Sequence, residues 1–122
     1  MNQLTEKIAL PTLQGLQFLE HNHILLFQNR RESEFEKPCW EIMLHDSTQI
    51  KLSSSITAEK IIRLLPHAGF FQINQSVILN LTFLDEIIFK SHQCELIAPL
   101  KHIKLTISRS QLVKLKEIYD IR

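Results

Sequence analysis

Apolar and polar residues alternate over much of the chain, and a period of two is typical of β-strands. Apolar side chains at every second position of 40–44 are followed by the Asp- and Ser-containing stretch 45–48 and a second apolar stretch at 50–52. This pattern predicts a β-hairpin. The run 24–27 is continuously apolar, which predicts a fully buried strand, and we expect it to pair with the hairpin.

The beginning of the chain predicts weaker strands. Residues 1–13 are a polar lead-in whose short apolar piece, 8–10, is stopped by Pro11 or confined by it to a sheet edge. We therefore expect an edge strand at most in this region. The alternation of Leu16 and Phe18 then predicts a half-buried strand.

One helix is predicted in the middle of the chain. Thr57 is a suitable N-cap residue, and the preceding Ile56 is placed to pack onto Ile61 as a hydrophobic staple. Pro66 marks the end of this helix. Its expected buried face consists of Ile61, Leu64 and Leu65.

A second helix is predicted near the end of the chain. Ser108 and Gln111 stand in an S-x-x-Q pattern, which is typical of a capping box. Apolar and aromatic residues then recur at helical spacing at Leu112, Leu115 and Tyr119.

The stretch 70–107 predicts further strands around a polar turn. Residues 70–73 are expected to form a strand, Ser76 to cap a single helical turn over 77–80, and 83–89 to return to a strand. Alternation at 103–107 predicts the clearest strand of the chain, with a basic outward face.

Together these elements predict a mainly β fold, mostly antiparallel, with about eight short strands in hairpins and two short helices. A length of 122 residues corresponds to about one domain, and we expect a single domain over 1–122 without a linker or repeat. Only two glycines occur, which excludes the Gly-rich phosphate loops of common nucleotide enzymes.

Net charge is only +1, but its distribution is uneven. Residues 1–80 hold seven basic and eight acidic side chains, whereas 81–122 hold seven and five, so the last third is the basic end. Two cysteines outside any C-x-x-C pair indicate neither a zinc ribbon nor a disulfide framework. No signal peptide begins the chain, and no apolar run approaches the ~20 residues of a membrane helix, so we expect a cytoplasmic protein without membrane association.

The strongest candidate for chemistry is a basic cluster that leads into the second predicted helix. A helix N-terminus offers unpaired N–H groups to a phosphate oxygen, and Arg109 can donate two hydrogen bonds to a guanine edge. The alternative is that Ser108 only caps the helix while the lysines solvate an exposed face. The cluster consists of Lys101, Lys104, Ser108, Arg109 and Ser110.

A mixed-charge segment follows the buried run 24–27. Residues 28–38 lack an apolar pattern and read as a solvated hairpin loop, but the adjacent Arg30 and Arg31 also fit phosphate contacts.

Catalytic and metal sites are not indicated. His21 and His23 would share one face of a strand, but no third ligand is close in sequence. The adjacent acids Asp85 and Glu86 would point to opposite faces of a strand and so form no carboxylate pair. We therefore expect no enzymatic activity, no metal and no cofactor.

Two stretches of the sequence resemble one known family. Residues 71–81 read F-Q-I-N-Q-S-V-I-L-N-L and are followed by Leu84 and Ile87, while 103–109 read I-K-L-T-I-S-R. They are similar to the LytTR-type DNA-binding domain of bacterial transcription regulators, which carries a phrase like F-x-R-I-H-R-S-x-I-V-N-L-x-x-I and, near its end, a strand leading into a Ser-Arg pair and a helix. The resemblance covers nearly the whole chain, and the fold it implies is an elongated arrangement of small antiparallel sheets with two or three short helices.

This resemblance implies sequence-specific binding of double-stranded DNA, at repeated sites, through loops that touch successive grooves. Compared with the family, the turn 74–76 lacks a basic donor, and three glutamates in the 30–37 loop would be repelled by phosphate. The DNA contacts it implies are Ser108 and Arg109, the turn residues Asn74, Gln75 and Ser76, and the loop with Arg30, Arg31 and Lys37, beside Lys101 and Lys104.

Partners other than DNA follow from the same resemblance. A homodimer on DNA and a separate sensor or regulator protein are both compatible with a domain of this kind, because family members usually join it to a receiver or a membrane sensor. The alternative function is a protein-interaction module on the same fold that modulates a DNA-binding partner, which the near-neutral charge favours.

Overall fold

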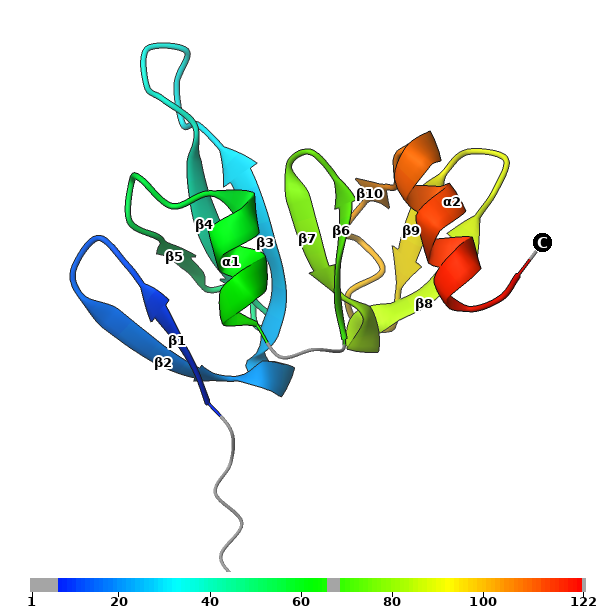
Figure 1. Ribbon diagram of the computed structural model, residues 1–122, viewed down its shortest axis with the longest axis horizontal. Coiled ribbons are helices and arrows are strands. Elements are labelled where there is room, and N and C mark those ends of the chain that lie inside the picture. Colours follow the sequence, from blue (N-terminus) through cyan, green and yellow to red (C-terminus); the bar gives the residue numbers. More distant parts are fainter. Residues whose placement is uncertain (1–6, 66–68, 122) are drawn as a thin grey trace, which may run out of the picture.

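Residues 7–65 and 69–121 are described by the structure, a computed structural model, and they form three antiparallel sheets, two α-helices and two 3-10 helices (Figure 1). In chain order the elements are β1 (Lys7–Pro11), β2 (Leu16–Glu20), η1 (His21–His23), β3 (Ile24–Arg30), β4 (Cys39–Leu44), β5 (Gln49–Lys51), α1 (Ala58–Leu64), β6 (Phe70–Asn74), β7 (Val77–Asn80), η2 (Leu81–Phe83), β8 (Leu84–Ile88), β9 (Gln93–Leu96), β10 (Leu105–Thr106) and α2 (Arg109–Ile118). The mainly β prediction is confirmed.

The central sheet has five strands in the order β5-β4-β3-β7-β6, and both of its faces are covered. One face packs against α1 and the β1–β2 hairpin. The other packs against α2 and the three-stranded sheet β10-β9-β8. The protein therefore has two hydrophobic cores that share one sheet.

Strand β3 supplies both cores, and a β-bulge explains how. Its pairing with β4 shifts register between Ile24 and Leu26. Ile24 and Phe27 face the core with α1, whereas the consecutive Leu25 and Leu26 both face the core with α2. All four are buried, so the continuously apolar run marks a strand in the middle of a two-sided sheet, as predicted.

The first α-helix begins and packs largely as predicted. The Thr57 hydroxyl accepts from the Lys60 amide at 3.2 Å, and Ile56 and Ile61 are buried in the same core. Leu64 is exposed, however, so only part of the predicted buried face is used. Pro66, where the sequence predicted the end of the helix, lies outside the described residues.

The β1–β2 hairpin confirms the predicted edge strand, but in β2 the alternating apolar residues lie on the exposed face. Ile8, Leu10 and Leu19 are buried in the core with α1. Leu16 and Phe18, whose alternation predicted the second strand, point outward and are 64% and 56% exposed. The alternation was real, but a strand's period does not say which of its two faces meets the core.

Residues 77–80 form strand β7, so the predicted helical turn capped by Ser76 is wrong. β7 lies between β3 and β6, and all of its residues are buried. Asn80 is polar and fully buried, and its amide donates to the carbonyl oxygens of His21 and Ile24 and accepts from the Thr82 amide. Those bonds satisfy the amide and tie η1 and η2 to the end of β7.

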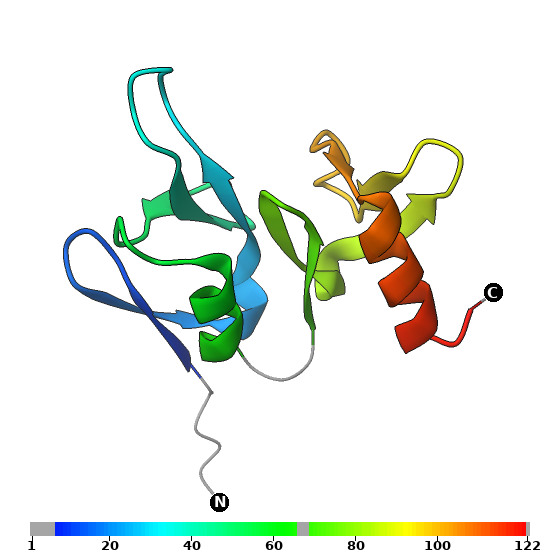
Figure 2. The same ribbon diagram turned by 45° about the horizontal axis from the view of Figure 1, so that its top comes forward.

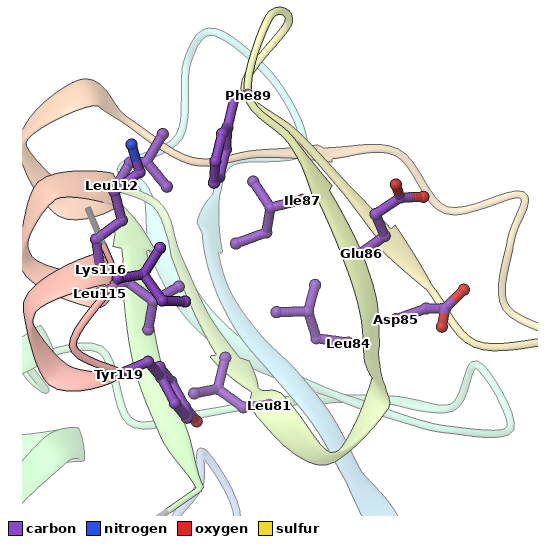
Figure 3. A pocket seen from close by; sticks show the side chains of 11 residues that line it. Leu81, Leu84, Asp85, Glu86, Ile87, Phe89, Leu112, Leu115, Lys116 and Tyr119 are labelled. Carbon is purple, nitrogen blue, oxygen red and sulfur yellow. The ribbon is translucent and has the colours of Figure 1, made fainter.

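The C-terminal sheet departs from prediction in two strands. A register shift between Leu84 and Glu86 bulges β8, and Figure 3 shows Asp85 and Glu86 on the same side of it, not on opposite faces. Of the alternating stretch 103–107, only β10 pairs with a neighbour, through Leu105 and Cys94 and through Thr106 and Gln93.

An apolar groove runs between β8 and α2, with a volume of about 370 Å³. Leu84 and Ile87 form one wall, and Leu112 and Leu115 form the other (Figure 3). Within the described residues, no helix is long and apolar enough to cross a membrane.

Candidate nucleic-acid interface

The turn between β6 and β7 is built by the side chain of Asn74. Its Oδ1 accepts from the Ser76 amide at 2.7 Å, which is the hydrogen bond of an Asx-turn. Its Nδ2 donates to the carbonyl oxygen of Thr106 at 2.7 Å. Asn74 therefore holds the turn in shape, and Gln75 at its tip is exposed.

The start of α2 is attached to the same hairpin. The Ser108 hydroxyl accepts from the Gln111 amide at 3.3 Å, so Ser108 is the N-cap, as predicted. The capping box is only half formed, because Gln111 Nε2 donates to the carbonyl oxygen of Gln72 at 2.6 Å and the Ser108 amide donates to that of Ile73 at 2.8 Å. The second half of the predicted motif has become a tertiary contact.

These bonds join two of the three predicted contact regions into one unit. A further bond, from the Asn29 amide to the Ser76 carbonyl oxygen at 2.8 Å, attaches the end of β3. Figures 1 and 2 show the β6–β7 turn and the start of α2 side by side at the same edge of the molecule. The loop 31–38 projects from the same edge but stands apart from them.

The exposed side chains of this unit are suited to nucleic acid. Arg109 is the first residue of α2 and is exposed, as is Ser110, whose hydroxyl lies 3.5 Å from that of Ser108. The first intrahelical bond is made by the Leu112 amide, so the amides of Arg109 and Ser110 precede the bonded part of the helix. A guanidinium, hydroxyls and free amides of a helix N-terminus are donors that phosphate and base edges accept.

Arg30 is engaged within the protein. Its Nε lies 3.0 Å from Glu41 Oε2, and its Nη2 donates to Gln49 at 3.4 Å. Glu41 is 3% exposed and also accepts from Gln28 at 2.7 Å, so Arg30 supplies the countercharge of a buried carboxylate. Arg30 therefore has a structural role as the partner of Glu41. A contact between Arg30 and DNA would have to use the N–H groups that these bonds leave free.

The loop 31–38 is exposed throughout. Lys51 Nζ lies 3.0 Å from Glu32 Oε1, and this contact lowers the pKa of Glu32 and raises that of Lys51. Arg31 and Lys37 flank this segment as exposed cations.

Three further lysines lie in segments that precede α2 or neighbour it. Lys104 is exposed, whereas Lys101 lies 3.9 Å from Asp85, a long contact between exposed side chains that contributes little. Lys90, which was not among the predicted contacts, is also exposed. Figure 1 shows its β8–β9 turn beside α2, and the Ile107 amide donates to the His92 carbonyl oxygen in that turn.

Histidine and cysteine side chains form no metal centre in the described residues. His21 and His23 lie in η1 and not on a strand, so the expectation that they share a strand face is wrong. Cys94 is buried, and burial raises the pKa of its thiol to about 11.

A family model for the LytTR DNA-binding domain matches residues 42–120, which is more than half of the chain. The protein belongs to the LytTR family. The matched residues include the β6–β7 turn and the start of α2, so the unit described above lies within the LytTR domain.

Comparison of structures supports the same fold. A LytTR DNA-binding domain from a methyl-accepting/DNA response regulator of Bacillus cereus superposes with a TM-score of 0.69 at 12% identity, over 93% of this chain and 95% of the other. No curated protein matches by sequence. This chain therefore carries a LytTR DNA-binding domain whose sequence has diverged widely from that relative.

Proposed function

We propose that this protein is a sequence-specific transcription regulator that reads double-stranded DNA through loops placed in successive grooves. The observation that carries the proposal is the joined unit of the β6–β7 turn and the start of α2. Three hydrogen bonds hold β6 and the turn after it against β10 and the start of α2, so Gln75 and Arg109 are presented from one rigid base. Rigid placement is what discrimination between base edges requires.

The contact residues divide into three roles. In this proposal Arg109 and Gln75 read base edges; both are exposed, and both side chains can form bidentate hydrogen bonds. Ser108, Ser110, Ser76 and the amides at the start of α2 offer hydrogen bonds to phosphates. Asn74 positions the turn, since its amide is occupied by the protein.

Cations around this unit would supply the sequence-independent attraction to phosphate. Lys104 precedes α2 in the chain, Lys90 lies in the β8–β9 turn beside α2, and Arg31 and Lys37 lie in the separate loop 31–38. That separation along the long axis of the molecule favours contacts with more than one groove (Figure 1). Repeated sites in the DNA would then recruit more than one copy.

A second candidate function is a protein-interaction module that modulates a DNA-binding partner. The observation that favours it is the loop 31–38, which carries three glutamates and an almost fully exposed Phe35. Carboxylates at the DNA-facing edge would weaken binding to phosphate.

One experiment separates the two functions. The chain is used to select duplexes from a random pool, and binding of a selected duplex is then measured by fluorescence anisotropy over a salt series. DNA binding predicts an enriched sequence and an affinity that falls steeply with salt, with a slope near −0.9 for each phosphate neutralised. An unenriched pool would reject the proposal and favour the interaction module.

A further inference from the structure

Within residues 7–65 and 69–121, the outer edges of the sheets are protected with one exception, which is β2. An unprotected edge strand offers a row of unpaired N–H and C=O groups to another chain, and proteins usually cover such edges or place charges on them. β2 is the last strand of the two-stranded sheet, with β1 on one side only. Figure 1 shows it at the outer margin of the molecule.

The other edge strands of the described sheets are covered or charged. At the edge of β1, the Pro11 carbonyl oxygen accepts a hydrogen bond from the Ser53 amide. At the edge of β5, the Lys51 carbonyl oxygen accepts one from the Leu13 amide. β6 is covered by the start of α2, and β10 is only two residues long. β8 is bulged and carries Asp85 and Glu86.

β2 carries a charge only at its last residue, Glu20, and within the described residues no backbone hydrogen bond from another segment reaches its outer edge. It contains no proline, and its pairing with β1 has no register shift. Leu16 and Phe18 lie on its outward face, opposite Pro11 and Ala9 of β1. Leu16 and Phe18 are exposed, and no other described segment covers the edge beside them.

The backbone groups on the free edge can be identified from the hairpin. The Thr12 amide donates to the Gly15 carbonyl at 2.7 Å, so Thr12 and Gly15 are a hydrogen-bonded pair. Bonded and non-bonded pairs alternate in an antiparallel ladder. The N–H and C=O groups of Leu16 and Phe18 consequently point away from β1, toward the free edge.

We propose that a second copy of this chain pairs with the free edge of β2, antiparallel and across a two-fold axis at Gln17. In this register the Leu16 of each copy forms a hydrogen-bonded pair with the Phe18 of the other, and the exposed backbone groups of both are satisfied. The two Gln17 side chains face each other, and amides can donate and accept between themselves.

The charge distribution of β2 favours a second copy as the occupant. Its charged residue, Glu20, is the last of the strand, so the register sets the two Glu20 carboxylates at opposite ends of the paired strands and brings no like charges into opposition. β8, by contrast, would oppose its own acids across a two-fold axis. β2 also lies away from the β6–β7 turn and the start of α2, so pairing leaves the DNA-facing edge open (Figures 1 and 2).

Cross-linking tests the position of the axis. In a Cys39→Ser background, Gln17→Cys places two thiols at a non-hydrogen-bonded pair, where Cα atoms about 4.5 Å apart permit a disulfide. Mild oxidation of the purified chain should give a covalent dimer. Lys37→Cys, in the exposed loop 31–38, is the matched control and should remain monomeric.

Sedimentation of the full chain provides the second arm. The parent protein should form a dimer that dissociates on dilution, because few residues pair, and Phe18→Lys should shift it to monomer, whereas Phe35→Lys should not. Circular dichroism verifies that both variants are folded, as expected for exposed side chains. The proposal would be overturned if the parent chain stayed monomeric at every concentration. It would also be overturned if a dimer formed that Phe18→Lys did not weaken and that did not cross-link at position 17. Neither result bears on DNA binding.

Discussion

Gln111 and Gln72 are 39 positions apart in sequence, yet the Nε2 of Gln111 donates to the carbonyl oxygen of Gln72 at 2.6 Å. This bond fixes the first turn of α2 to strand β6. It therefore sets where Arg109 points relative to the β6–β7 turn. A residue that touches no DNA can in this way control how DNA is read.

Gln111→Ala removes this bond and leaves the Gln72 carbonyl oxygen without its donor. We expect the free energy of unfolding to fall by about 0.5–1.5 kcal/mol, and the affinity difference between the preferred duplex and its single-base variants to shrink because Arg109 is held less rigidly. Urea denaturation and anisotropy titration measure the two effects. Gln75→Ala is the matched control, since that side chain is exposed; it should leave stability unchanged, and an equal loss of stability there would contradict the assignment.

Arg109→Ala tests direct reading of a base. We expect a loss of about 1–3 kcal/mol against the preferred duplex and relaxed discrimination at one position. Binding to the parent duplex and its single-base variants, followed by anisotropy, gives both numbers. Lys114→Ala, farther along the same helix, should weaken binding far less and leave discrimination intact. Unchanged affinity of the Arg109 variant would remove Arg109 from the interface.

Arg30 and Arg31 are neighbours with different expected roles. Arg30→Ala leaves the buried Glu41 carboxylate with Gln28 as its remaining side-chain donor, so we expect about 1–3 kcal/mol of lost stability. Arg31→Ala should leave stability unchanged but reduce the slope of affinity against salt by about one phosphate contact. Thermal unfolding and a salt series on both variants check this. The assignment fails if Arg31→Ala is the less stable variant.

The two cysteines should differ sharply in reactivity. Thiolates react and thiols do not, and a pKa raised to about 11 keeps Cys94 protonated at pH 8. The half-buried Cys39 should therefore be alkylated by iodoacetamide first. Intact-mass spectrometry should show one modification under native conditions and two in denaturant. Rapid double labelling of the native protein would contradict the burial of Cys94.

Much of the fold could be predicted because local signals agreed with tertiary packing. The apolar run 24–27 predicted a buried strand, and Thr57 and Ser108 are the N-caps that the sequence indicated. The prediction failed where a neighbouring segment decides the conformation. Residues Val77–Asn80 form a strand because β3 and β6 pair with them on both sides. The local sequence gives no sign of those neighbours.

The candidate site was predictable to a similar degree. The Ser108–Arg109 pair and the polar turn 74–76 follow from residue type and the resemblance to the LytTR family. The way the two segments are joined could not be predicted, because the bonds from Asn74 to Thr106 and from Gln111 to Gln72 link segments that are distant in sequence. Lys90 was not predicted as a candidate contact, because the β8–β9 turn lies beside α2 only in the folded chain.

The shared central sheet limits how this protein can be divided. A fragment that ended after β7 would keep α1 and the β1–β2 hairpin but expose Leu25, Leu26 and Leu79 on a bare apolar face. Such a fragment should aggregate, since a large uncovered apolar patch seeks another surface. Neither half is a self-sufficient folding unit, so genetic truncation, domain grafting or proteolytic trimming has to keep both cores together.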